Sequence, residues 1–174
     1  MNTQKPKGAP KPKRQRAIAG SGDGIGFHRY SLYVAAHDRI KQAIADGYYL
    51  EAITLIESIL SDRLESRTSF LKKQNQGFKT LGDLLGILVE KETVPEFREL
   101  LPVINDWRDR RNKALHELVK FEHGDFRPWP EKIAGLSLIA AQGLDVLRSF
   151  DKLDKRERRR NGARPAATEP NALE

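Results

Sequence analysis

Apolar residues recur every three or four positions along most of this chain, a spacing that predicts amphipathic α-helices. Five segments show it, at about residues 31–46, 48–73, 80–91, 95–121 and 130–152. No alternating run rich in valine, isoleucine and threonine lies between turn residues, so no sheet is expected. The pattern therefore predicts an all-α bundle of four or five helices.

Turn and capping residues separate these segments. Gly47 is a suitable stop for the first helix. Thr80 and Asp83 form a Thr-x-x-Asp capping pattern at the start of the third helix. Residues 93–96 repeat that pattern before the fourth helix, with Pro95 in the first turn, where a missing amide proton costs least.

The charge is concentrated at the two ends of the chain. Residues 1–30 hold seven lysines and arginines against one aspartate, and residues 151–174 hold seven against five acids, whereas residues 31–150 are nearly neutral. The prolines, glycines and lysines near the start offer too little apolar surface to offset the entropy of ordering. We expect a disordered basic tail at 1–30, a helical domain at 31–152 and a basic, mostly disordered tail at 153–174, in which residues 155–160 can extend the last helix as a basic end. Such tails strengthen binding to a polyanion without selecting a sequence.

Several classes of site and location are not expected. The chain has no cysteine, and His28, His37 and His123 lack ligand partners at i+3 or i+4, so we expect no zinc site. The glycine-rich run at residues 20–26 has neither a preceding strand nor a Gly-Lys-Ser/Thr ending, which favours a linker over a nucleotide-binding loop. No apolar run is long enough for a signal peptide or a membrane span, which predicts a cytoplasmic protein.

An arginine lies in the middle of the apolar face of the fourth helix. On a helical wheel the apolar positions between Phe97 and Leu118 cluster within roughly 40° of Arg111. Burying an unpaired guanidinium is expensive, so this charge needs a partner, a cavity or an anion. Glu57, next to the apolar stripe of the second helix, is the candidate partner. Asn112 and His116 are four residues apart and lie side by side at the edge of the same face.

The segment Arg111-Asn112-Lys113-Ala114-Leu115-His116 resembles the Arg-x(4–6)-His motif of HEPN domains, in the variant where a polar residue follows the arginine. The resemblance covers about residues 31–150. It implies a helical bundle and, as in many members of that family, a metal-independent ribonuclease of toxin–antitoxin or phage-defence systems. It further implies an RNA substrate, no cofactor, a cognate antitoxin protein, and catalytic roles for Arg111, Asn112 and His116.

These residue types suit RNA cleavage without a metal. RNA carries its own nucleophile, the 2′-hydroxyl, so the reaction needs proton transfers and a cation for the phosphorane. The unperturbed pKa of histidine, about 6.5, suits His116 to the proton transfers. The guanidinium of Arg111 can bond two phosphoryl oxygens and stays charged. Asn112 is placed to orient His116 or to bond a phosphate.

Other interpretations of the same residues remain open. Arg110, six residues before His116, also fits the loose motif but lies away from the histidine on the wheel, and Arg108 and Glu57 are further supporting or alternative residues. Arg111 would be a purely structural residue if its role were to pair with Glu57. The domain would then be a non-catalytic HEPN-like module that regulates or binds a partner. A third interpretation is a helical adaptor that binds nucleic acid through its basic tails.

A two-fold homodimer is expected, because an arginine at the centre of an apolar arc is hard to bury in a monomer. The resemblance likewise implies one site built from two protomers. The motif helices of two protomers would face one another, and Trp107, in the same apolar arc as Arg111, would anchor the interface. The alternative is a monomer in which Glu57 neutralises Arg111 and the arc is core. Trp107 and Trp129 are themselves expected to pack in the core or in a turn, with base stacking as the minor alternative.

Overall fold

The computed structural model of this protein describes residues 25–73, 79–120 and 127–162. They form five α-helices: α1 (Ile25–Ala45), α2 (Tyr49–Lys72), α3 (Leu81–Lys91), α4 (Pro95–Glu117) and α5 (Trp129–Gly162). No strand occurs in these three segments. The expectation of an all-α fold with five helices is confirmed.

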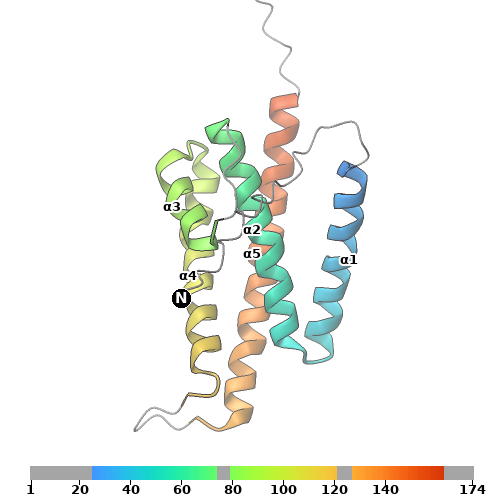
Figure 1. Ribbon diagram of the computed structural model, residues 1–174, viewed down its shortest axis with the longest axis vertical. Helices are drawn as coiled ribbons and strands as arrows, with labels where there is room; N and C mark the ends of the chain where they lie inside the picture. The colour runs from blue at the N-terminus through green and yellow to red at the C-terminus, as the bar shows by residue number, and fades with distance from the viewer. Residues whose placement is uncertain (1–24, 74–78, 121–126, 163–174) are drawn as a thin grey trace, which may run out of the picture.

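The long helices α2 and α5 lie side by side at the centre of the bundle. α1 packs mainly on α2, α4 packs on α5, and the short α3 packs on α2 and α4. Figure 1 shows α1 at one side of the central pair and α4 at the other, with α3 beside the upper part of α2. The hairpin of α4 and α5 therefore carries the Arg111 to His116 segment along one side of the bundle.

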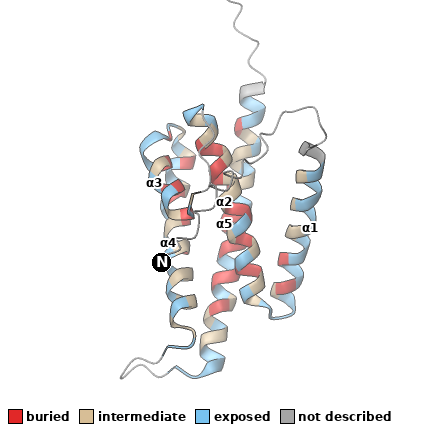
Figure 2. Ribbon diagram, viewed as in Figure 1, coloured by how far each residue is buried: buried red, intermediate tan, exposed pale blue. Residues whose placement is uncertain are grey.

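The core fills the space between these helices. Figure 2 shows the buried residues on the inward faces of α2, α4 and α5, while the outer faces are exposed. The rings of Phe97 on α4 and Phe150 on α5 meet edge to face, with centroids 5.3 Å apart. Large side chains with less than two per cent exposure dominate the core: Trp107, Phe97, Phe150, Ile40, Ile53, Ile56, Leu60, Leu64, Leu84, Leu88, Ile104 and Leu136.

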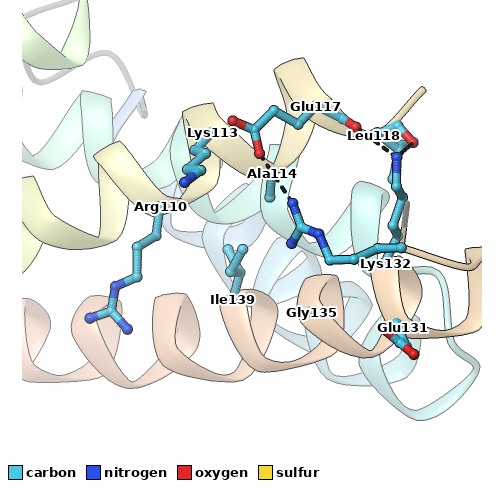
Figure 3. A pocket seen from close by; sticks show the side chains of 10 residues that line it. Arg110, Lys113, Ala114, Glu117, Leu118, Glu131, Lys132, Gly135 and Ile139 are labelled. Atoms are coloured by element: carbon cyan, nitrogen blue, oxygen red, sulfur yellow. Dashed lines mark hydrogen bonds and ion pairs between the residues drawn. The ribbon is translucent and has the colours of Figure 1, made fainter. Parts of the chain in front are cut away.

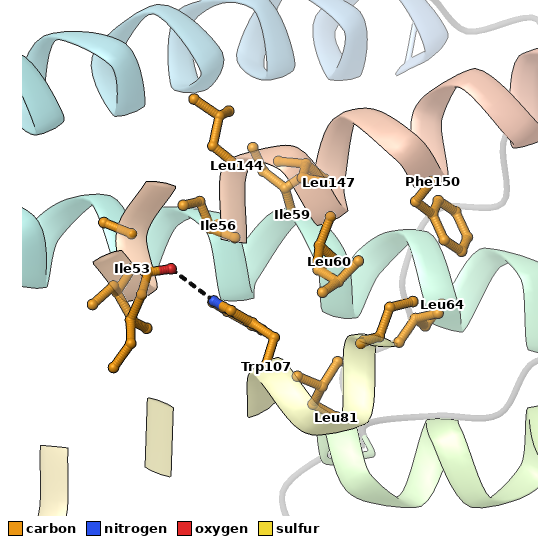
Figure 4. Packing of buried hydrophobic residues seen from close by; sticks show 14 of the residues in the cluster. Ile53, Ile56, Ile59, Leu60, Leu64, Leu81, Trp107, Leu144, Leu147 and Phe150 are labelled. Atoms are coloured by element: carbon orange, nitrogen blue, oxygen red, sulfur yellow. Dashed lines mark hydrogen bonds between the residues drawn. The ribbon is translucent and has the colours of Figure 1, made fainter. Parts of the chain in front are cut away.

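Trp107 is a core residue and not an interface anchor. Its side chain is almost fully buried, with 1% exposure, and its indole N–H donates to the carbonyl of Ile139 on α5 at 2.9 Å. Figure 4 shows the ring inside the cluster of aliphatic residues from α2 and α5. The expectation that Trp107 packs in the core is confirmed. Its expected use as an interface anchor is wrong, because the arc of α4 that carries it packs on the protein's own helices.

Two helices are longer than expected. α1 begins at Ile25, so residues 25–30, assigned above to the N-terminal tail, belong to a helix. Arg29 holds this first part in place, since its guanidinium bonds Asp62 and Ser66 of α2. α5 continues to Gly162 and not to about 152, with ion pairs from Arg158 to Asp154 and from Arg160 to Glu157 along the extension. The expected disorder of residues 1–24 and 163–174 lies outside the described residues.

The capping prediction is confirmed at the start of α3 and is wrong at the start of α4. The capping box of Thr80 and Asp83 at the start of α3 is confirmed, with both reciprocal hydrogen bonds present. The expected side-chain cap from residue 93 is wrong. The N-cap residue of α4 is Val94, and no side-chain hydrogen bond caps the helix there. The carboxylate of Glu92 instead accepts the backbone N–H groups of Thr93 and Val94, each at 3.0 Å.

α4 also ends earlier than expected. Its last residue is Glu117, and the expected helical residues up to 120 are not helical. Residue 121 lies outside the described residues. The end of α4 therefore follows directly after His116, which places this histidine in the final turn.

Within the described residues, one helix is long and apolar enough, by length and composition, to cross a membrane, and it is α5. Nearly half of its most apolar window, 44%, is buried inside the bundle. Core helices of soluble proteins commonly pass the same test. The length of α5 is accounted for by its central position in the fold.

Candidate functional site

Arg111 points from α4 toward α2 and is bonded to Glu57. Its Nη2 donates to Glu57 Oε1, and the two side chains are 12% and 33% exposed. The guanidinium carbon lies 6.0 Å from the centroid of the Trp107 ring. The predicted partner of Arg111 is thus confirmed, and the pair ties α4 to α2.

The pairing does not satisfy the whole guanidinium. The Nε–H group of Arg111 is buried and has no hydrogen-bond partner in the described part of the chain. A buried unsatisfied donor costs free energy. Glu57 therefore satisfies the guanidinium of Arg111 only in part.

Asn112 is half-buried and His116 is exposed, one turn apart on the same flank of α4. Within residues 25–73, 79–120 and 127–162 neither side chain makes a hydrogen bond or an ion pair. Asn112 and His116 are free to meet a ligand from solvent. The structure therefore brings Asn112 and His116 together at the surface, with Arg111 anchored beside them.

Lys132 of α5 fixes the end of the helix that carries His116. Its ammonium group donates to the carbonyl oxygens of Glu117 and Leu118, both at 3.0 Å, and to that of Lys120 at 3.3 Å. A cation at this position satisfies carbonyls that lack helical partners and interacts favourably with the helix dipole. Sequence reasoning missed Lys132, because the contact joins residues more than ten positions apart.

The alternative arginines point elsewhere. Arg108 bonds Asp109 and covers Gly82 of α3, where an added Cβ would lie 2.6 Å from its Nη1. Arg110 bonds Asp106 and, at 3.1 Å, Gln142 of α5. Arg108 and Arg110 thus flank the Arg111 position on opposite sides and do not replace it.

A groove of about 290 Å³ lies between the end of α4 and the start of α5. Figure 3 shows Arg110, Lys113 and Glu117 along the α4 side of the groove. Glu117 is ion-paired with Arg127, another lining residue, at 3.3 Å. Asn112 and His116 do not line this groove, because they lie on the other flank of α4. Its lining is Arg110, Lys113, Ala114, Glu117, Leu118, Arg127, Glu131, Lys132, Gly135 and Ile139.

A second polar cluster joins α1, α2 and α5, and sequence reasoning missed it. Asp62 accepts hydrogen bonds from Arg29 and from the hydroxyl of Tyr33, and burial, assisted by that bond, raises the pKa of Tyr33. Asp151 of α5 lies 3.3 Å from His37 and 2.9 Å from Nε of Arg63. These groups neutralise one another, so the cluster fastens α1 to the bundle.

No group of three or more histidine, cysteine, aspartate or glutamate side chains in the described segments is arranged to hold a metal ion. Comparison with protein-family models, curated proteins and solved structures yields no match.

Proposed function

We propose that this protein is a metal-independent endoribonuclease whose site is the Asn112 and His116 flank of α4. The observation that carries the proposal is that His116, exposed and without a partner in the described chain, lies in the last turn of the helix that also holds Arg111 and Asn112. The resemblance of this segment to HEPN domains supports the same reaction.

In the proposed reaction the 2′-hydroxyl of the RNA attacks the adjacent phosphorus. The O2′–P bond forms, the P–O5′ bond breaks, and the products are a 2′,3′-cyclic phosphate and a 5′-hydroxyl. His116 moves a proton, either from the 2′-hydroxyl or to the leaving 5′ oxygen. Arg111 stabilises the charge on the phosphorane, and Asn112 orients the phosphate or the histidine.

The Glu57–Arg111 pair has a specific part in this proposal. Glu57 holds the guanidinium in place in the free protein, and the phosphate competes with it when RNA binds. A carboxylate and a phosphate are both suitable partners for a guanidinium. Loss of the carboxylate charge would therefore loosen Arg111 without removing it.

A two-fold homodimer completes the proposed site, since a second His116 can supply the other proton transfer. The dimer uses the exposed flank with Asn112 and His116, because the apolar arc is occupied by the core. Light scattering checks this part. A mass near one chain of 19.8 kDa in a preparation that cleaves RNA would exclude the shared site.

Cleavage of single-stranded RNA by purified protein in EDTA tests the reaction. His116→Ala should lose about a hundredfold or more in rate, as expected when a general acid–base group is removed. His28→Ala is the matched control, because it removes an exposed histidine from α1, and it should keep the rate. Cleavage that survives in His116→Ala, or that stops with EDTA, would contradict the proposal.

One observation favours a second function, that of a non-catalytic module that binds or regulates a partner. Arg111 is only 12% exposed and is already bonded to Glu57, as expected for a purely structural ion pair. In this case purified wild-type protein would cleave no RNA, and Arg111→Ala would change stability alone. A role as a toxin or phage-defence effector with a cognate antitoxin belongs to the first proposal and requires cleavage.

A further inference from the structure

The outer face of α5 carries a row of cations along its second half. Arg148, Lys152, Lys155 and Arg159 follow one another at spacings of four, three and four residues, which places them on one side of a helix. All four are exposed. At a rise of about 1.5 Å per residue the row is about 16 Å long. We call these four residues the α5 basic row.

Acidic residues of the same segment lie on other sides of the helix. Asp151 faces His37 and Arg63 inside the bundle. Asp154 and Glu157 are only 16% and 10% exposed as side chains, and each is paired with an arginine. From residue 148 to residue 159, exposed cations and covered acids are thus separated, so this part of the outer face is more basic than its composition indicates.

Most of the α5 basic row is not neutralised. Arg148 pairs with Asp145 at 3.2 Å. Lys152, Lys155 and Arg159 make no hydrogen bond or ion pair with the residues that the structure describes. Three free cations on one helical face form a strongly positive surface.

The helix dipole accounts for Arg159, which lies in the last turn of α5, but not for the rest of the row. A cation interacts favourably with the dipole only within the last turn. Lys152 lies about three turns before the end of α5 at Gly162, and Arg148 lies earlier still. Packing does not account for it either, because these side chains are exposed to solvent.

We propose that the α5 basic row binds the phosphate backbone of RNA. The row is straight and exposed, three of its four cations have no partner among the described residues, and side chains three or four residues apart lie about 5–6 Å from one another. It would meet several phosphates of one strand, since the backbone carries a negative charge at each nucleotide. Such contacts position a nucleic acid but do not read its sequence. The choice of RNA rests on the proposed function.

Binding of a fluorescent single-stranded RNA, followed by anisotropy, tests the row. All chains are full-length and carry His116→Ala so that the RNA stays intact. The test variant adds Lys152→Gln, Lys155→Gln and Arg159→Gln, and glutamine keeps the helix propensity close to that of lysine and arginine. The control variant removes the same charge from three exposed cations on other helices: Lys41→Gln, Lys91→Gln and Arg98→Gln.

The test variant should bind at least tenfold more weakly than the parent at about 0.1 M salt, and the control should stay within about threefold. The slope of log affinity against log salt should fall by about two, at ~0.7 for each lost phosphate contact to a single strand. Circular dichroism should show equal helicity for all three chains. Equal weakening of both variants, or none, would overturn the inference. A parent chain that binds polyglutamate, a polyanion without phosphate, but does not bind RNA would also overturn it.

This experiment separates the inference from the proposed function. If RNA binds through the row but the wild-type protein does not cleave it, the inference about the row is supported and the proposed ribonuclease activity is contradicted. If the wild-type protein cleaves RNA but the test variant binds it unchanged, the ribonuclease proposal is supported and the inference about the row is contradicted.

Discussion

The indole of Trp107 packs directly on the backbone of Gly143. A Cβ built on Gly143 would lie 2.7 Å from both Cε2 and Nε1 of the ring, so only glycine permits this approach of α4 to α5. The ring cannot move away without losing its hydrogen bond to the carbonyl of Ile139, which lies one turn before Gly143 on α5.

Gly143→Ala should therefore destabilise the protein. Alanine favours a helix by up to about 1 kcal/mol over glycine, but overpacking a core typically costs about 1–3 kcal/mol. The clash is with a rigid, enclosed ring, so we expect a net loss of about 1–2 kcal/mol in urea unfolding. Gly86→Ala on α3 is the control, because a Cβ there meets nothing within 4 Å. It should stabilise the protein, and a similar gain for Gly143→Ala would refute the packing argument.

The Arg67–Glu92 pair should be a main determinant of stability. Their side chains are 7% and 1% exposed and are joined by two hydrogen bonds of 2.7 Å. Removing one charge from a buried pair leaves the other unpaired, at a cost of about 3–5 kcal/mol. Glu92→Gln should lose about that much in chemical denaturation. Glu51→Gln, which breaks the exposed Arg39–Glu51 pair, should leave the stability nearly unchanged, because solvent screens an exposed pair.

The contribution of Glu92 should depend on pH in a defined direction. Burial alone raises the pKa of its carboxyl, but the hydrogen bonds from Arg67 and from two backbone amides outweigh burial and hold the pKa below its usual value. The stabilisation is therefore complete above the unfolded pKa, about 4.3, and is lost as the pH falls through the folded value. The difference in unfolding free energy between wild type and Glu92→Gln should shrink from pH 7 to pH 3. A constant difference would contradict this assignment.

Substitutions of Arg111 and His116 should change the free energy of unfolding by different amounts. Arg111→Ala removes a mostly buried side chain and leaves Glu57 without its ion pair, so we expect a loss of about 1–3 kcal/mol. His116→Ala changes an exposed residue and should stay within about 0.5 kcal/mol. Thermal unfolding of both variants checks this difference. A large loss in His116→Ala would undermine its use as a test of catalysis.

Features that depend on neighbours in the chain were predictable from sequence. The capping box joins Thr80 and Asp83, which are three positions apart. Gly47, in the turn that follows α1, has a positive φ of 81°. The five helices follow from the spacing of apolar residues, since one helical face must be buried. The need for a partner at Arg111 also followed, because its charge lies in an apolar arc, and Glu57 was identified from its own position on a helix.

Features that depend on which helices meet were not predictable. Glu92 replaces the expected cap at residue 93 because Arg67, from another helix, holds its carboxylate there. Trp107 faces α5 and not a second protomer because Gly143 leaves room for its ring.

The sequence by itself thus determined the helices, their main boundaries and the charge that needed a partner, because these depend on local spacing and on the cost of burying a charge. Only the tertiary structure decided where α1 begins, what holds the end of α4, and which surfaces stay free. Asp62 and Lys132 act across more than ten residues of chain, and no spacing rule reports such contacts. The exposure of His116 and of the α5 basic row was decided in the same way, since a residue is free only where no other helix covers it.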